Sequence, residues 1–133
     1  MHLIVCVDDR YGMSFCGRRL SRDVVLIEHI LHLTSGSKLW IHPASAGLFP
    51  EKSVVADPAF FEKSQHGDFC FAETTPIPTK IADLESVILY HWNRSYPSTM
   101  KFPQELLRGM HLLRAEDFPG NSHEKIIMEQ YIL

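Results

Sequence analysis

The feature that most constrains the fold is a short, uninterrupted apolar run near the start of the chain, Leu3-Ile4-Val5-Cys6-Val7, which ends at Asp8-Asp9. Five consecutive apolar residues are too few to span a membrane, and they lack the alternation of a half-solvated strand. A strand that is apolar on both faces is typical of a parallel sheet with other elements packed above and below it. The run therefore predicts a central, buried strand in an α/β protein.

One dominant helix is predicted after this strand. Ser21 is a favoured N-cap residue, and Asp23 suits the positively polarised first turn, so we expect a helix over 23–33 that ends at Thr34-Ser35-Gly36. Its apolar residues cover most of its circumference, which indicates that the helix packs against a sheet.

The remaining pattern predicts a mostly parallel mixed sheet that closes with an antiparallel C-terminal hairpin. Strands are expected at 38–42, 53–56, 68–73 and 86–92, with one helical turn over 44–49. The closing pair is expected at 110–115 and 126–132, joined through the turn-forming residues Phe118-Pro119-Gly120-Asn121. Residues 1–133 are therefore predicted to form a single α/β domain.

Composition restricts the classes of function. Apolar residues make up 45% and charged residues 22% of the chain, which is typical of globular proteins. The net charge of −3 gives no general attraction to nucleic acid, so such a partner is possible only through a local basic patch and is not favoured. Three widely spaced cysteines, no signal-peptide pattern and no long apolar stretch lead us to expect a cytoplasmic protein without a membrane role. The sequence leaves the oligomeric state open.

Three arginines, a glycine and a serine crowd the predicted helix start in a chain that is acidic overall. Free backbone N–H groups there favour an anion, and guanidinium groups add charge-assisted hydrogen bonds. The residues of this predicted anion site are Gly17, Arg18, Arg19, Ser21 and Arg22. We expect Arg18 or Arg19 to hold the anion, and the double change to alanine to abolish binding while folding stays almost intact. The alternative is that the arginines pair with Asp8, Asp9 or Asp23.

Other polar residues are candidates for metal binding or catalysis. Asp8 and Asp9 follow a strand and could hold Mg²⁺, but neighbours on an extended chain face opposite sides, which favours a solvated strand end. His29 and His32 could share a helix face, yet no cysteine or acid at a specific spacing completes a zinc site. Cys16 lies near the arginines without an evident base. No metal site is predicted.

The order of the segments resembles dihydrofolate reductase over most of the chain. The segments that carry the resemblance are "VDDRYGM" leading to a helix that opens on Asp23, "LTSGSKLWIHP", "SVVADPAF" followed by "GDFCFAET", "SVILYHWNRSYPSTMKFP" and "NSHEKIIMEQYIL". The resemblance implies the reductase fold, with a mobile glycine-containing loop before the helix. It also implies that Asp23, as the early acid of the helix, faces a heterocyclic ligand, which makes Asp23 the candidate catalytic residue.

The same resemblance shows where this chain departs from the family. The family has a Gly-Gly turn after a central strand, opening a helix that meets the nicotinamide cofactor, but only twelve residues separate Glu73 from Ser86 here. The family's loop tryptophan is replaced within Gly17-Arg18-Arg19-Leu20, and Ile41-His42-Pro43 stands where a glycine-arginine pair helps to hold cofactor phosphate. NADPH binding is therefore not expected, and no other cofactor is expected.

A second resemblance concerns the segment "VDDRYGMSFCGRRLSRD", which is similar to short bacterial proteins that carry the label ribonuclease Z. True ribonuclease Z has a zinc motif that begins His-x-His, and this sequence contains no His-x-His. The leading hypothesis is a reductase-like domain that binds a small anionic or heterocyclic ligand in a loop-and-acid cleft. The alternatives are a hydrolase acting on nucleotide or RNA phosphates, with Asp8 or Asp9 holding a metal, and a protein-interaction module. Whether the protein is an enzyme stays open at this point.

Overall fold

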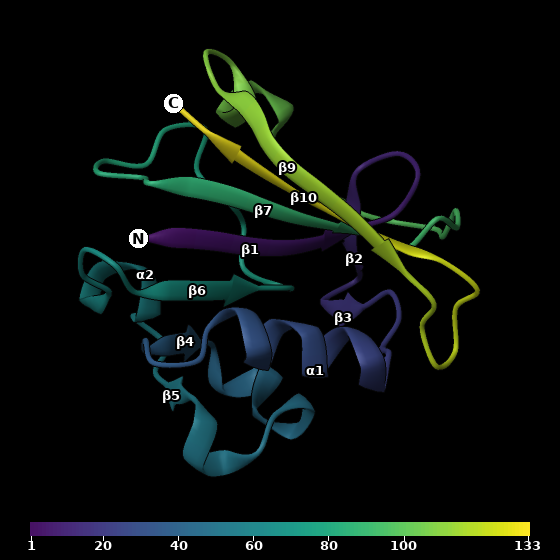
Figure 1. Cartoon of the computed structure of the whole chain (residues 1–133), viewed down its shortest axis with the longest axis horizontal. Coiled ribbons are helices and arrows are strands. Elements are labelled where there is room, and N and C mark those ends of the chain that lie inside the picture. The colour runs from purple at the N-terminus through teal and green to yellow at the C-terminus, as the bar shows by residue number, and fades with distance from the viewer.

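The computed structural model describes residues 1–133 and has the predicted α/β architecture (Figure 1). Its elements are β1 (His2–Val7), β2 (Gly12–Phe15), β3 (Arg18–Arg19), α1 (Val24–Leu33), β4 (Leu39–Ile41), η1 (Pro43–Leu48), η2 (Glu51–Ser53), β5 (Val55–Ala56), α2 (Phe60–Lys63), β6 (Phe69–Ala72), β7 (Ser86–His91), β8 (Met100–Lys101), η3 (Gln104–Leu107), β9 (His111–Phe118) and β10 (Ile126–Ile132).

The main sheet has seven strands in the order β5-β4-β6-β1-β7-β10-β9. Strand β1 lies at its centre and pairs in parallel with β6 on one side and β7 on the other. The two C-terminal strands β9 and β10 pair antiparallel, and β10 also runs antiparallel to β7. The predicted mostly parallel sheet with an antiparallel end is thus confirmed.

The apolar run that forms β1 supplies both hydrophobic cores of the domain. Leu3, Val5 and Val7 belong to one core, and Ile4 belongs to the other, because successive side chains of a strand point to opposite faces. Helix α1 lies across the Ile4 face, where Leu26 and Ile30 are buried (Figure 1). This packing fixes the start of α1 beside the carboxyl ends of the parallel strands.

The opposite face of the sheet is covered mainly by connections between strands. The connection from Thr74 to Glu85 contains no helix, in keeping with its short length. Ile77 from this connection and Phe102 and Leu106 from the segment before β9 pack on that face. No helix of the structure combines the length and the apolar character needed to cross a membrane.

Several local predictions are corrected by the structure. The N-cap of α1 is Asp23 rather than Ser21. The predicted glycine loop is largely a β-hairpin: β2 and β3 are joined by Cys16 and Gly17, both with positive φ (48° and 77°), as a type I′ turn requires. The three-stranded sheet β3-β2-β8 and the short helix α2 were not predicted. Each of these elements is only two to four residues long, which is too short to show a hydrophobic period.

Candidate functional site

Asp23 sits at the start of α1, and its side chain is completely buried (0% exposed). Oδ1 caps the helix by accepting hydrogen bonds from the backbone N–H groups of Val25 (2.9 Å) and Leu26 (3.2 Å). The β9–β10 loop supplies two more backbone donors, Asn121 to Oδ1 (3.0 Å) and Ser122 to Oδ2 (2.8 Å). The carboxylate therefore joins the helix start to a loop almost one hundred residues away in sequence.

The donors around Asp23 keep it ionised. Burial alone would raise the pKa of this carboxyl, but hydrogen bonds from the Asn121 N–H, the His123 ring and the Ser122 N–H outweigh burial and hold the pKa well below its ordinary value. The close approach of the loop depends on Gly120, because a Cβ at that position would lie 2.5 Å from Asp23 Oδ2. Asp23 is thus an ionised carboxylate, and both of its oxygens accept hydrogen bonds from groups of the same protein.

His123 is the second buried polar group of this region. Its Nδ1 lies 3.0 Å from Asp23 Oδ2, and its Nε2 lies 3.0 Å from Ser21 Oγ and 3.1 Å from Tyr96 Oη. The imidazole ring stacks on Trp92, with ring centroids 4.6 Å apart. Both ring nitrogens have hydrogen-bond partners and one face of the ring is stacked, so the orientation of the imidazole is fixed.

The predicted anion site is not assembled at the helix start. The protein's own Asp23 carboxylate occupies the N–H groups that were expected to receive an external anion. Gly17 and Arg18 belong to the β2–β3 hairpin, where Gly17 forms the turn and Arg18 is exposed. The structure therefore separates these two residues from Asp23.

Arg19 instead forms an ion pair with an acid that was not considered at the sequence level. Its Nε lies 3.0 Å from Oε1 of Glu73, the residue that directly follows β6, and its guanidinium also contacts Oε2 (3.2 Å). The buried Ser45 hydroxyl donates to the same carboxylate (2.6 Å). Burial, reinforced by the negative charge of Glu73, raises the pKa of the nearby Cys6 thiol. Arg19 therefore lies at the carboxyl end of β6, where its positive charge compensates the nearly buried negative charge of Glu73.

A small cleft opens between α1 and the segment that contains η1. Its volume is about 250 Å³. We call it the helix cleft; its lining residues are Arg22, Asp23, Val24, Ile27, Glu28, Leu31, Leu48 and Pro50. Arg22 and Asp23 of the predicted set thus border one cavity, whereas Gly17, Arg18, Arg19 and Ser21 do not line it.

Two features make the helix cleft suitable for an amphiphilic ligand. Arg19 and Arg114 are the arginines that form ion pairs, so the guanidinium of Arg22 is available to an anion. Val24 is 55% exposed although it is apolar, and Leu48 faces the same cavity from the other side. The cleft therefore combines an unpaired positive charge with apolar walls.

The acids that follow β1 have structural contacts. Asp8 is buried and accepts hydrogen bonds from the backbone N–H groups of Arg10 (2.9 Å), Gly12 (2.6 Å) and Tyr96 (2.9 Å). Burial would raise the pKa of Asp8, but these N–H donors lower it below its usual value. Asp9 accepts from the Ser95 hydroxyl (3.2 Å). No group of three metal-ligating side chains occurs in the structure.

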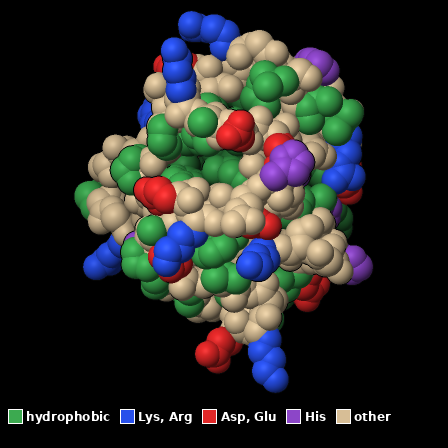
Figure 2. Space-filling view, turned by 90° about the vertical axis from the view of Figure 1, so that its left-hand side faces the viewer, with side chains coloured by type: hydrophobic (Ala, Val, Ile, Leu, Met, Phe, Trp, Pro, Cys, Tyr) green, Lys and Arg blue, Asp and Glu red, His purple; other side chains and the backbone are tan.

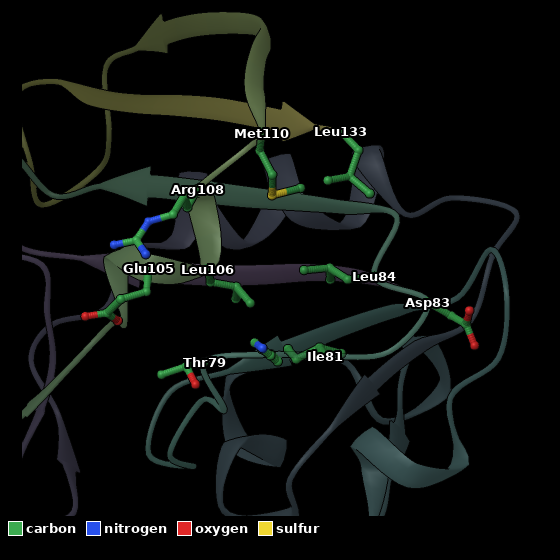
Figure 3. A pocket seen from close by; sticks show the side chains of 10 residues that line it. Thr79, Ile81, Asp83, Leu84, Glu105, Leu106, Arg108, Met110 and Leu133 are labelled. Carbon is green, nitrogen blue, oxygen red and sulfur yellow. The ribbon is translucent and has the colours of Figure 1, made fainter.

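A larger hollow lies on the sheet face opposite α1, near both chain ends. It encloses about 700 Å³, and its apolar lining consists of Ile81, Leu84, Leu106, Met110 and Leu133. Figure 3 shows Arg108 and Glu105 at one end of this hollow and Asp83 at the other. Figure 2 shows the same side of the molecule, where hydrophobic side chains line a depression surrounded by charged ones. The hollow borders the connection that lacks a helix.

Sequence analysis did not identify His123, Glu73 or Ser45 as candidate site residues. His123 lies within a polar loop, and its contacts to Ser21 and Asp23 span 102 and 100 residues. Glu73 and Ser45 meet because they follow the neighbouring parallel strands β6 and β4, and no local pattern encodes this pairing. Only the predicted topology, with strand ends gathered at one edge, could have suggested these contacts.

No protein-family model matches the sequence, and neither does any curated protein. Among solved structures, dihydrofolate reductase from Enterococcus faecalis, complexed with NADP(H) and RAB-propyl, is similar with a TM-score of 0.69. The similarity covers 98% of this chain and 94% of that chain at 10% sequence identity. The arrangement inferred from segment order is therefore confirmed in three dimensions: this chain has a dihydrofolate reductase-like fold.

Proposed function

We propose that this protein binds a small molecule with an apolar body and an anionic group in the helix cleft, without nicotinamide chemistry. The observation that carries the proposal is the unpaired guanidinium of Arg22 at a cleft walled by apolar side chains of α1 and the η1 segment. Small-molecule sites are typically concave and apolar with a few polar groups that orient the ligand. Arg22 is the group that would select for negative charge.

The environment of Asp23 narrows the class of ligand. An acid that recognises a heterocycle must offer a free carboxylate oxygen to ring N–H groups. Both oxygens of Asp23 already accept hydrogen bonds from the chain's own donors. We therefore assign recognition to Arg22 and the apolar walls, and assign Asp23 to holding the cleft in shape.

NADP(H), which is bound in the Enterococcus faecalis reductase structure, does not suit the residues present here. A dinucleotide phosphate favours the free N–H groups of a helix start. Strand β6 is followed by no helix before β7, and the residue after β6 is the acidic Glu73. Glu73 is already paired with Arg19 at this strand end, so this arginine is used by the chain's own acid rather than by a phosphate. No step of the proposed function involves the cofactor.

The first test is a titration with NADPH, followed by nicotinamide fluorescence. We expect no saturable binding at micromolar cofactor, because neither the helix nor a phosphate-binding arginine follows β6. The Enterococcus faecalis reductase, titrated under the same conditions, is the positive control. Saturable binding in the micromolar range would contradict the proposal that nicotinamide chemistry is absent.

The second test concerns the charge of Arg22. The probe is 4-aminobenzoyl-glutamate, an aromatic ring that carries carboxylates, and binding is followed by amide chemical shifts of α1. Loss of one charge-assisted bond costs about 1.5–3 kcal/mol, so Arg22→Ala should weaken binding by roughly ten- to a hundredfold.

Arg18→Ala is the matched control, because Arg18 is an exposed arginine a few residues away that does not line the cleft. It should bind the probe as the wild type does. Equal affinity in the Arg22→Ala variant, or no shift of α1 amides in the wild type, would overturn the proposed site.

A further inference from the structure

We propose that Ser21, His123 and Asp23 form a nucleophile–base–acid triad that hydrolyses small carboxylic esters. This activity goes beyond ligand binding in the helix cleft. The three side chains come from the segment before α1, from the α1 N-cap and from the β9–β10 loop.

The distances between the three side chains allow the serine hydroxyl to transfer its proton to the imidazole. Ser21 Oγ lies 3.0 Å from His123 Nε2, and His123 Nδ1 lies 3.0 Å from Asp23 Oδ2. Both distances lie within the range required of a nucleophile and its base, with the base oriented by a third group. The two contacts use opposite nitrogens of one ring, as proton transfer from serine to an acid-supported imidazole requires.

The protonation pattern follows from hydrogen-bond chemistry. An ionised carboxylate only accepts hydrogen bonds, so the contact with Asp23 places the imidazole proton on Nδ1. Nε2 of the neutral ring then carries a lone pair directed at the Ser21 hydroxyl. This is the tautomer in which His123 can remove the serine proton.

The surrounding contacts hold the Asp23 and His123 side chains in place before any substrate binds. Asp23 is held by backbone N–H groups from two segments, and His123 is stacked on Trp92. Asp23 and His123 are almost fully buried, at 0% and 1% side-chain exposure, whereas Ser21 is only half-buried. A buried base–acid pair beside a partly exposed hydroxyl is the arrangement in which serine can meet a substrate from solvent.

Donors for a developing oxyanion also lie next to Ser21. The backbone N–H groups of Arg22 and Asp23 make no hydrogen bond within the protein. Tyr96 Oη shares Nε2 with Ser21 (3.1 Å), and once Nε2 is protonated this hydroxyl is free to donate elsewhere. These groups could supply the electrostatic stabilisation that acyl transfer needs.

The reaction proceeds in two balanced steps. Ser21 Oγ attacks the ester carbonyl carbon while its proton moves to His123 Nε2; the C–O bond to the alcohol then breaks, and the alcohol leaves with that proton. Water attacks the resulting acyl-serine with His123 as base, which releases the carboxylic acid and restores the serine hydroxyl. The half-buried position of Ser21 leaves its hydroxyl open to an ester from solvent.

The test is labelling of the intact protein with a fluorophosphonate, followed by peptide mass mapping, together with hydrolysis of p-nitrophenyl acetate. We expect one adduct, located on Ser21. Ser21→Ala should abolish the adduct and reduce ester hydrolysis by roughly a hundredfold. Circular dichroism would check that the variant is folded, since Ser21 contributes only one hydroxyl to the network.

Ser95→Ala is the matched control, because Ser95 is an exposed serine beside Tyr96 that contacts Asp9 rather than His123. This variant should keep the adduct and the hydrolysis rate. The adduct on Ser21 and the binding of 4-aminobenzoyl-glutamate are measured separately on the wild type, so failure of the triad and failure of the anion site are distinguishable. No adduct on the wild type, or an adduct that persists in Ser21→Ala, would overturn the proposal.

Discussion

Replacing Asp23 by alanine is expected to destabilise the protein by about 3–5 kcal/mol, the cost of removing one member of a buried polar pair. The change leaves four backbone N–H groups and His123 without their acceptor at a site closed to water. It also removes the cap of α1. The measurement is urea unfolding at pH 7, followed by circular dichroism.

The matched control for this change is Asp9→Ala, because Asp9 is an exposed acid in the loop after β1. Surface changes of this type usually alter stability by less than about 0.5 kcal/mol. Equal, small effects of the two substitutions would show that the Asp23 network contributes little to folding.

The same carboxylate gives a pH dependence with a defined sign. The pKa of folded Asp23 lies well below its ordinary value, so ionised Asp23 contributes its full stability above the pKa of the unfolded chain, about 3.9. That contribution is lost as pH falls through the folded pKa. The stability difference between the wild type and Asp23→Ala should therefore be smaller at about pH 2.5 than at pH 7.

Arg19→Ala is expected to cost about 2–3 kcal/mol, somewhat less than for a fully buried pair because the Arg19 side chain is 30% exposed. Glu73 is only 9% exposed, and without Arg19 its carboxylate would keep only the hydrogen bond from the Ser45 hydroxyl. This result differs from the sequence-based expectation that alanine at Arg18 and Arg19 leaves folding almost intact. The structure gives the reason, which is the ion pair with Glu73.

Arg18→Ala provides the control for Arg19→Ala, since both residues belong to β3 and Arg18 forms no ion pair. Arg18→Ala should shift the urea midpoint little. Adding Glu73→Gln to Arg19→Ala should recover part of the lost stability, because the uncompensated charge is removed. If Arg19→Ala lowers the urea midpoint as little as Arg18→Ala does, the ion pair does not contribute significantly to stability.

The framework of the fold could be predicted because its strands and helix have clear hydrophobic patterns. The apolar run of β1 indicated a central strand, and the last strand was predicted with the bounds that the structure shows, Ile126–Ile132. Strand β9 extends to Phe118, three residues beyond the prediction, which missed this end because Glu116 and Asp117 are exposed and polar. Burial leaves a pattern in the sequence, but exposed edge strands are defined by hydrogen bonding to a neighbour.

The candidate site could be predicted only in part. Asp23 was singled out from the resemblance and from its place near a helix start, and Arg22 from the cluster of arginines. Whether a polar side chain faces a cavity or its own chain depends on partners such as His123 and Glu73, which are brought in by tertiary packing. Arg18, Arg19 and Arg22 lie within five residues and could not be distinguished by sequence, but the structure gives each a different environment.

The position of β1 at the centre of the sheet has a consequence for how the protein is made. Strand β1 leaves the ribosome before both of its neighbours and must wait for them, since His2 and its β7 contact Ser86 are separated by 84 residues. At typical rates of about 5–20 residues per second, the apolar strand stays unpaired for several seconds. Its two long-range parallel pairings also imply slow closure of the sheet. The nascent chain should therefore be a client for chaperones that bind short apolar segments until β7 has emerged.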